Sequence, residues 1–329
     1  MNFNLIGLIR AAVLNGTPLL YGTSGEILTE KSGNLNLGVP GIMYLGGISG
    51  LTASFLYEYG TDDPNAFVSV MLAIVACLAA SALGGLIYSF LTITLRTNQN
   101  VTGLTLTIFG GGIANFIGGM LQRMSGGVGQ VSVSVASGAF RRYSATLAGS
   151  KSDLTYAFFG YGWLAYVAIA AAVLMFFFLN KTRTGLNLRA TGENPATADA
   201  DGINVTAYKY AGTCIGAAIT GLGGLYYVMD YIKGTWANDG TIEALGWLAV
   251  ALVIFATWRP LNTIWGAYLF GLLSWAFLYA SNLNRYSIEL FKMLPYLATL
   301  IVLIIVSLRR KKEDQPPMHL GLPYFREER

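Results

Sequence analysis

The chain of 329 residues is 54% hydrophobic and 12% charged, about half the charged share of an average soluble protein, so its composition places it in a membrane. Its formal net charge of +4 is too small to indicate a nucleic-acid partner. One histidine and two cysteines are too few for a histidine metal site or a Ser-His-Asp triad inside the membrane.

The apolar stretches predict an all-α, polytopic membrane protein with about nine transmembrane helices, within a range of eight to ten. A helix needs about 20 mainly apolar residues to cross a bilayer. In chain order the candidate spans are residues 5–24, 37–57, 67–95, 101–121, 163–179, 208–229, 242–257, 261–282 and 288–308. The polar residues 25–36, which include Glu26, are expected to form a loop between the first two spans.

The opening of the second span predicts a discontinuous helix near the N-terminus. Residues 37–47 read LGVPGIMYLGG, with Pro40 among several glycines. Irregular backbone at membrane depth survives only where protein or a wet cavity satisfies it, so such an entry would line a path. An ordinary kinked helix is the alternative, in which the small residues, such as Gly46 and Gly50, make close helix contacts.

The fourth apolar stretch carries Thr105, Thr107 and Asn115, which suit a helix that faces a pathway. Threonines also bond back to the carbonyls of their own helix, so packing alone is the alternative. The long loop that follows, residues 122–162, is rich in Gly, Ser and Val. It is expected on the external side, either as a docking surface for an external partner or as an unstructured loop.

A polar interruption at residues 181–207 is expected to contain its own short helix. Asn194 can cap it, Pro195 suits the first helical position, and Gly202 supplies a left-handed stop. The alanines between them leave little bulk on its surface, so the helix suits a groove of another protein. The alternative is a solvated loop with a chance helical turn.

The basic residues predict the orientation of the chain. With nine spans, the interruption at 181–207 and the basic tail at 309–329 lie on the same side, because four helices separate them. Thirteen of the 21 lysines and arginines fall on that side, which the positive-inside rule assigns to the cytoplasm. Residues 1–308 are therefore expected to form one transmembrane domain with an external N-terminus and a cytoplasmic tail.

The source of energy follows from what the sequence lacks. No GxxxxGK[ST] stretch occurs, so a partner would have to bind any ATP that drives transport. An ion-coupled carrier is the alternative, but it usually carries acidic residues or histidines within its spans, and here Asp230 and Glu243 lie at span ends. A membrane enzyme is a further alternative, disfavoured because the spans hold no paired catalytic carboxylates or metal cluster.

Three stretches carry a family resemblance. Residues 25–47 (GEILTEKSGNLNLGVPGIMYLGG), 188–204 (LRATGENPATADADGIN) and 321–329 (GLPYFREER) resemble the permease subunits of ATP-binding cassette (ABC) importers. Within that family they are most similar to the nucleoside-import branch, which is related to the ribose, galactose and branched-chain amino acid permeases. The resemblance implies a type II importer-like permease of the bacterial plasma membrane that carries a nucleoside or, alternatively, a simple sugar such as ribose or galactose.

The same resemblance implies the partners. A second, usually different permease chain would form the other half of the path, and a cytoplasmic ATPase would bind ATP and Mg²⁺. An extracellular or periplasmic lipoprotein would bind the substrate, and no cofactor would bind to this chain. Arg183 and Arg189, which flank the short helix, are expected to meet lipid phosphate, with an acidic surface of the ATPase as the alternative.

Two sets of residues follow from this resemblance. The contact with the ATPase, in a coupling helix, would be formed by Glu193, Asn194, Pro195, Ala196, Ala198, Asp199 and Gly202. The substrate path would be lined by Asn34, Asn36, Tyr44, Thr105, Thr107 and Asn115, with Tyr44 either stacking on a base or packing at a helix contact.

Overall fold

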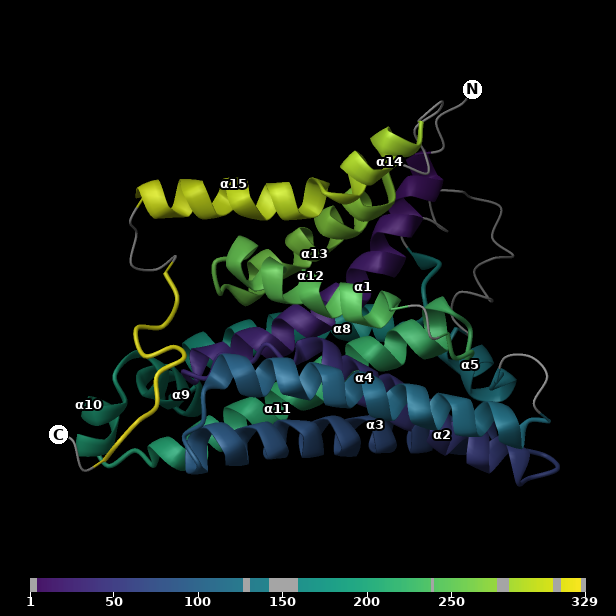
Figure 1. The fold of residues 1–329 in the computed structure, drawn as a ribbon, viewed down its shortest axis with the longest axis horizontal. Helices are drawn as coiled ribbons and strands as arrows, with labels where there is room; N and C mark the ends of the chain where they lie inside the picture. The colour runs from purple at the N-terminus through teal and green to yellow at the C-terminus, as the bar shows by residue number, and fades with distance from the viewer. Residues whose placement is uncertain are drawn as a thin grey trace.

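The computed structural model describes residues 5–126, 131–141, 159–237, 240–276, 284–309 and 315–326. Within these ranges every regular element is helical, apart from an isolated bridge between Ser132 and Thr235, so the all-α prediction is confirmed. The helices form one elongated bundle (Figure 1). They are α1 (Leu5–Lys31), α2 (Val39–Tyr59), α3 (Ala66–Ser89), α4 (Gln99–Met124), α5 (Ser134–Phe140), α8 (Trp163–Lys181), α9 (Arg183–Glu193), α10 (Pro195–Ala200), α11 (Val205–Tyr226), α12 (Thr241–Phe255), α13 (Pro260–Trp275), α14 (Arg285–Lys292) and α15 (Leu294–Arg309).

Five helices of the described residues are long and apolar enough to cross a bilayer. They are α2, α4, α8, and α3 and α11 with their π-helical ends, η1 (Phe90–Thr94) and η2 (Tyr227–Tyr231). A sixth span results if α14 and α15, which are bent by 44°, cross together. The predicted number of nine is not confirmed. Helix α1, although 27 residues long, is not among these candidates, and α12 and α13 have only 15 and 16 residues, whereas a straight span needs about 20.

The first helix differs from its prediction. Residues 25–36 were expected to form a loop, but α1 continues to Lys31, and Glu26 and Glu30 lie buried on it, 1% and 3% exposed. Both carboxylates accept hydrogen bonds from groups outside α1. Glu26 Oε1 accepts a hydrogen bond from Asn36 N at 3.0 Å, and the indole of Trp258 donates to Glu30 Oε2. A polar sequence therefore stays helical inside the protein.

The second helix is unbroken, so the predicted discontinuous helix is not found there. Helix α2 begins at Val39 and has Pro40 in its first turn, where proline needs no partner for a missing N–H. Gly46 lies so close to α11 that a Cβ on it would be 2.5 Å from Gly221 O. This residue therefore serves helix packing, as the alternative interpretation predicted.

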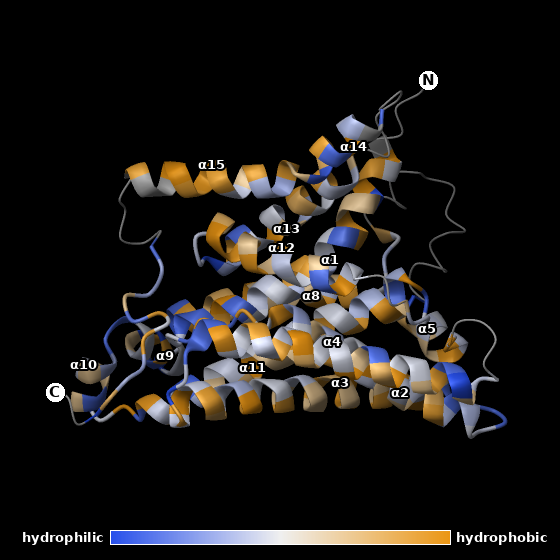
Figure 2. Ribbon diagram, in the orientation of Figure 1, coloured by the Kyte–Doolittle hydropathy of each residue, from blue (hydrophilic) through white to orange (hydrophobic). Residues whose placement is uncertain are grey.

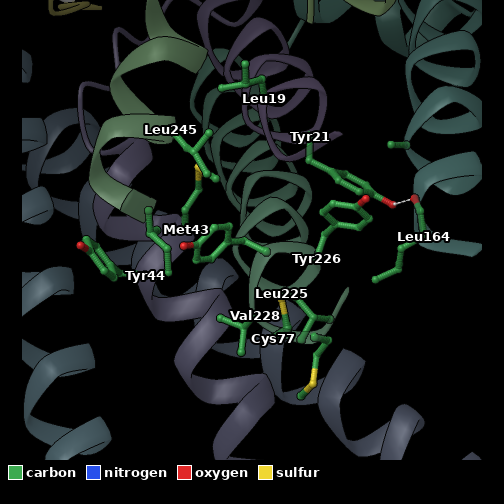
Figure 3. Packing of buried hydrophobic residues seen from close by; sticks show 14 of the residues in the cluster. Leu19, Tyr21, Met43, Tyr44, Cys77, Leu164, Leu225, Tyr226, Val228 and Leu245 are labelled. Carbon is green, nitrogen blue, oxygen red and sulfur yellow. Dashed lines mark hydrogen bonds between the residues drawn. The ribbon is translucent and has the colours of Figure 1, made fainter. Parts of the chain in front are cut away.

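The centre of the bundle is formed by α1, α2 and α11. In α2 and α11 most of the apolar span is buried, 78% and 72%, against 28% in α3 and 33% in α4 and α8. Figure 3 shows the packing at the centre, where Tyr21 of α1 lies beside Tyr226 of α11 and donates to Leu164 O at 2.8 Å. The outer helices α3, α4, α8 and α15 carry exposed apolar side chains. Figure 2 shows that α15 is apolar over most of its length.

Most of the predicted external loop, residues 127–130 and 142–158, lies outside the described residues. Its described part contains α5, whose first turn is fixed by Glu58 from the end of α2. The carboxylate of Glu58 accepts hydrogen bonds from Val135 N at 3.1 Å and Ala136 N at 2.7 Å. A carboxylate suits this position because the first N–H groups of a helix have no partner within it.

Candidate functional site

The interruption at 181–207 contains two helices, α9 and α10, where one was predicted. Thr182 ends α8 and caps α9, since its hydroxyl accepts from Gly185 N at 3.0 Å and donates to Phe178 O at 2.6 Å. Helix α9 then packs its buried side on the end of α1. A Cβ on Gly192 would meet Lys31 O, so the two backbones touch there.

The short helix α10 is built as its local sequence predicts. Asn194 leaves the helical region, with φ −147° and ψ 90°, and its side chain accepts from Thr197 N at 3.1 Å. Pro195 follows at the first helical position. Gly202 has φ +83° and ends the helix, while Ile203 N donates to Ala198 O at 3.0 Å across the turn. This pattern is a Schellman-type stop.

Helix α10 has two different faces. Pro195 and Ala198 are buried against the rest of the chain, and Asp199 is partly buried. The other residues predicted to contact the ATPase are exposed, namely Glu193, Asn194, Ala196 and Gly202. The exposed side therefore presents a capped helix end with small side chains, with the carboxylates of Glu193 and Asp201 at its two ends, to an outside surface.

The C-terminal tail crosses this region, a contact that the sequence did not predict. In Figure 1 the yellow segment, residues 315–326, passes beside α9 and α10. His319 N donates to Gly192 O at 3.0 Å, and Met318 N donates to Glu193 Oε2 at 3.2 Å. Gly321 N reaches Gly33 O at 3.3 Å. The tail thus touches α9 and the α1–α2 turn together.

The end of the tail holds the middle of α10. Tyr324 OH donates to Asp199 Oδ2 at 3.0 Å, and Arg326 Nε lies 3.1 Å from the same oxygen. The neighbouring Phe325 ring lies 4.3 Å from the guanidinium carbon of Arg96 in the α3–α4 turn. The aromatic and basic residues of 321–329 were the only sequence signal that the tail makes a contact, but the neighbouring sequence does not indicate which surface they meet.

Two of the predicted path residues, Asn34 and Asn36, lie buried in the α1–α2 turn. Asn34 Nδ2 donates to Thr213 Oγ1 of α11 at 2.8 Å. Asn36 joins the turn to α1 through Glu26 and accepts from Gly38 N at 2.9 Å. These contacts place both side chains where they brace the turn.

The other predicted path residues do not converge on one cavity. Tyr44 is buried against Trp236, with ring centroids 6.3 Å apart, and Thr107 donates to Leu37 O at 3.0 Å. Thr105 is exposed and bonds back to Val101 O within its own helix. Asn115 is partly buried, and its Oδ1 has no hydrogen-bond partner among the described residues. A path between two permease chains would need the second chain to complete it.

The described residues contain no group of three or more His, Cys, Asp and Glu side chains that could hold a metal ion. Glu26 and Glu30 are close enough for their charges to interact, but the pair is enclosed by Trp258, Asn36 and the surrounding helices. The two carboxylates therefore stabilise the packing of α1, and they do not form a solvent-accessible metal or catalytic site.

Residues 8–303 match the family model described as "Branched-chain amino acid transport system / permease component". The chain is 34% identical to TsgC13 of Haloferax volcanii, which is provisionally named a glucose ABC transporter permease, over 81% of this chain and 75% of that one. It is 29% identical to the nucleoside ABC transporter permease NupC of Lactococcus lactis, over 92% and 94% of the two chains.

A third relative is aligned over nearly its whole length. The guanosine ABC transporter permease NupQ of Bacillus subtilis is 28% identical, over 98% of this chain and 97% of that one. No solved structure matches at the significance applied to these comparisons.

Proposed function

The chain belongs to the family of permease components of branched-chain amino acid transport systems, and we propose that it is a membrane subunit of an ATP-driven importer that forms half of the path for a nucleoside. Two relatives that align over more than nine-tenths of this chain are named for nucleoside or guanosine transport. A simple sugar is the second candidate substrate, because the relative with 34% identity is named for glucose.

Helix α10 is the element that supports the proposed coupling to an ATPase. A six-residue helix is capped at both ends and keeps one face exposed. The chain contains no nucleotide-binding loop of the Walker type. We propose that a cytoplasmic ATPase, which binds ATP and Mg²⁺, receives the exposed face of α10 in a groove.

The contacts of α10 give a route for the motion. Its buried face, through Pro195 and Ala198, packs on the rest of the chain, and α9 touches the end of α1 at Gly192. Closure of the ATPase would move α10 and α9 together, and α1 would transmit the movement to the centre of the bundle. Substrate chemistry is not required, so the chain is proposed to be a transport subunit and not an enzyme.

The surface of α3 and α4 is the proposed contact with a second permease chain. The exposed apolar side chains on these helices need lipid or protein around them, and we propose that the second chain covers part of this surface. They include Phe67, Val75, Leu83, Leu86, Val101, Ile108 and Phe116. A substrate-binding lipoprotein would dock at the opposite end from α10, and the tail side of the bundle would face the cytoplasm of a bacterial cell.

Glu26 and Glu30 lie buried on α1, so a scarcity of acidic residues no longer speaks against an ion-coupled carrier. Family membership now disfavours the carrier, and dependence on ATP tests it directly. Uptake of labelled nucleosides and sugars by the reconstituted complex, with and without ATP, separates these functions.

A linker replacement tests the coupling role. Residues 193–199 are exchanged for a Gly/Ser segment of equal length, and the variant is expected to insert in the membrane without retaining the ATPase or importing substrate. A Gly/Ser exchange of the exposed residues 61–63, in the turn between α2 and α3, is the control. Import at the normal rate by the 193–199 variant would exclude α10 as the coupling helix.

A further inference from the structure

A polar cavity of about 320 Å³ lies where the tail, the α3–α4 turn and the start of α11 meet. It is at the same end of the bundle as α10, and Asp199 and Gly202 of that segment form part of its wall. This volume is near the lower end of the range for small-molecule sites, about 300 to 1,000 Å³. The cavity therefore has room for a small metabolite.

The wall of the cavity contains a buried cation without a counter-charge. The Lys209 side chain lies on the first turns of α11, and the residue is 3% exposed. Among the residues that the structure describes, its ammonium group has no hydrogen bond or ion pair, and Gly33 and His319 are its neighbours. A charge taken out of water is costly unless it is paired. An anion that entered the cavity would therefore stabilise the charged form of this lysine.

The other charges in the wall also favour a negatively charged ligand. Arg96 and Arg326 add two further cations, while Asp199 is the only acidic residue in the lining and is already paired with Arg326. Arg96 has a left-handed backbone, φ 56°, in the turn after η1. Its guanidinium lies over Phe325 and has donors that a cation–π contact does not use.

Neutral donors surround these cations. The lining includes the amides and hydroxyls of Asn34, Thr92, Gln99, Asn204, Thr206 and Tyr324. Arginine, lysine and neutral donors converging on a small cavity suit an oxyanion with several acceptor oxygens, and phosphate is the common biological case.

We propose that this cavity binds a phosphate group, either as inorganic phosphate or as the phosphomonoester of a small metabolite such as a nucleoside monophosphate. The wall joins three segments, so the bound anion bridges Lys209 of α11, Arg96 of the α3–α4 turn and Arg326 of the tail. Occupancy therefore holds the tail against α10. The site is independent of the proposed import function, since binding requires neither ATP nor a partner chain.

Equilibrium binding to the full-length chain tests the site. The protein is placed in phosphatidylcholine nanodiscs, and radiolabelled phosphate, GMP and guanosine are compared. Phosphate and GMP are expected to bind saturably, and uncharged guanosine is expected not to bind at this cavity. Lys209→Met is expected to weaken binding about 10-fold or more, because a charge-assisted contact is lost. Lys181→Met, an exposed lysine outside the cavity, is the matched control and is expected to bind like the unmodified chain.

A second variant covers the case in which Lys209→Met fails to fold. Arg96→Gln changes an exposed side chain of the same cavity and is expected to weaken phosphate binding with an unchanged elution volume in size-exclusion chromatography. Absence of phosphate and GMP binding by the unmodified chain would overturn the proposal. Normal affinity in folded Lys209→Met or Arg96→Gln protein would do the same.

A third arm identifies the source of the phosphate group. Suppose that nanodiscs containing phosphatidylglycerol abolish phosphate binding, and that Lys209→Met protein retains less phosphatidylglycerol than the unmodified chain. The ligand is then a lipid headgroup, and the anion site stands. Unchanged phosphate binding in those nanodiscs assigns the site to a soluble ligand. Because no transport is measured, failure of this site and failure of the import function remain distinguishable.

Discussion

Arg326 Nε lies 3.1 Å from Asp199 Oδ2, so the last described residue of the chain contacts the middle of the exposed helix α10. The arginine side chain is 75% exposed and the carboxylate 12% exposed. An exposed ion pair contributes about 0.2 to 1 kcal/mol. The tail is therefore held by several modest contacts, including the Tyr324 hydroxyl on the same oxygen, and not by one strong bond. Such a contact can open and close as conditions change.

Removal of the Asp199 carboxylate is expected to loosen the tail. In Asp199→Ala both the Arg326 and the Tyr324 contacts are lost, and amide hydrogen exchange in residues 317–324 is expected to rise about fivefold, equivalent to ~1 kcal/mol. Asp201→Ala is the matched control, because it removes the same charge from an exposed position of the same segment. Equal exchange in the two variants would show that the tail is held without Asp199.

Docking of the tail is expected to weaken at acidic pH. Burial and the nearby positive charge of Lys209 lower the pKa of His319, and its Nδ1 is buried without a partner among the described residues. The docked state thus favours neutral imidazole. The docked state is fully stable above the pKa of an unburied histidine, about 6.5. Its stability declines as the pH falls below that value and through the lower pKa that His319 has in the docked state.

The test of this pH dependence uses the single histidine of the chain. Exchange of residues 317–324 is followed from pH 7.5 to pH 5 and corrected for intrinsic exchange. His319→Gln is expected to remove the acid-induced rise, since glutamine does not titrate. A rise of the same size in that variant would assign the effect to another group.

Loss of the α10 cap is expected to reduce import. Asn194→Ala removes the acceptor for Thr197 N, which costs about 1 kcal/mol at an N-cap. The helix end frays, and uptake of the labelled nucleoside that the unmodified complex imports is expected to fall several-fold at an equal amount of protein in the membrane. Asn194→Asp keeps an acceptor and is expected to retain most of the uptake. Full activity of the alanine variant would mean that the cap does not contribute to coupling.

The contact between α2 and α11 is expected to tolerate no added side chain at Gly46. A methyl group there would lie 2.5 Å from Gly221 O and 2.6 Å from its Cα, and neither backbone atom can rotate away. Gly46→Ala is therefore expected to lower stability by about 1 to 3 kcal/mol. Gly112→Ala on α4, where no atom lies within 4 Å of the added carbon, is the control. Thermal unfolding in detergent compares them, and equal melting temperatures would contradict the predicted clash.

Short-range signals made some features predictable from the sequence alone. Asn194, Pro195 and Gly202 define both ends of α10 through contacts that reach only a few residues along the chain. Length and hydropathy likewise identified spans such as α3 and α8, because an apolar helix crosses a bilayer whatever its neighbours are. The family assignment rests on the order of local motifs along the chain and was confirmed.

Contacts between distant segments decided the rest. The polar residues 25–31 read as a loop, yet they remain helical and buried because Trp258 and Asn36 supply hydrogen bonds to Glu30 and Glu26. Nothing near residue 199 in the sequence indicates that Arg326 will neutralise its carboxylate. The sequence thus determined the membrane class, the family and the form of α10. Only the tertiary structure decided which polar groups find partners, since a buried charge is stable or costly according to what the fold places beside it.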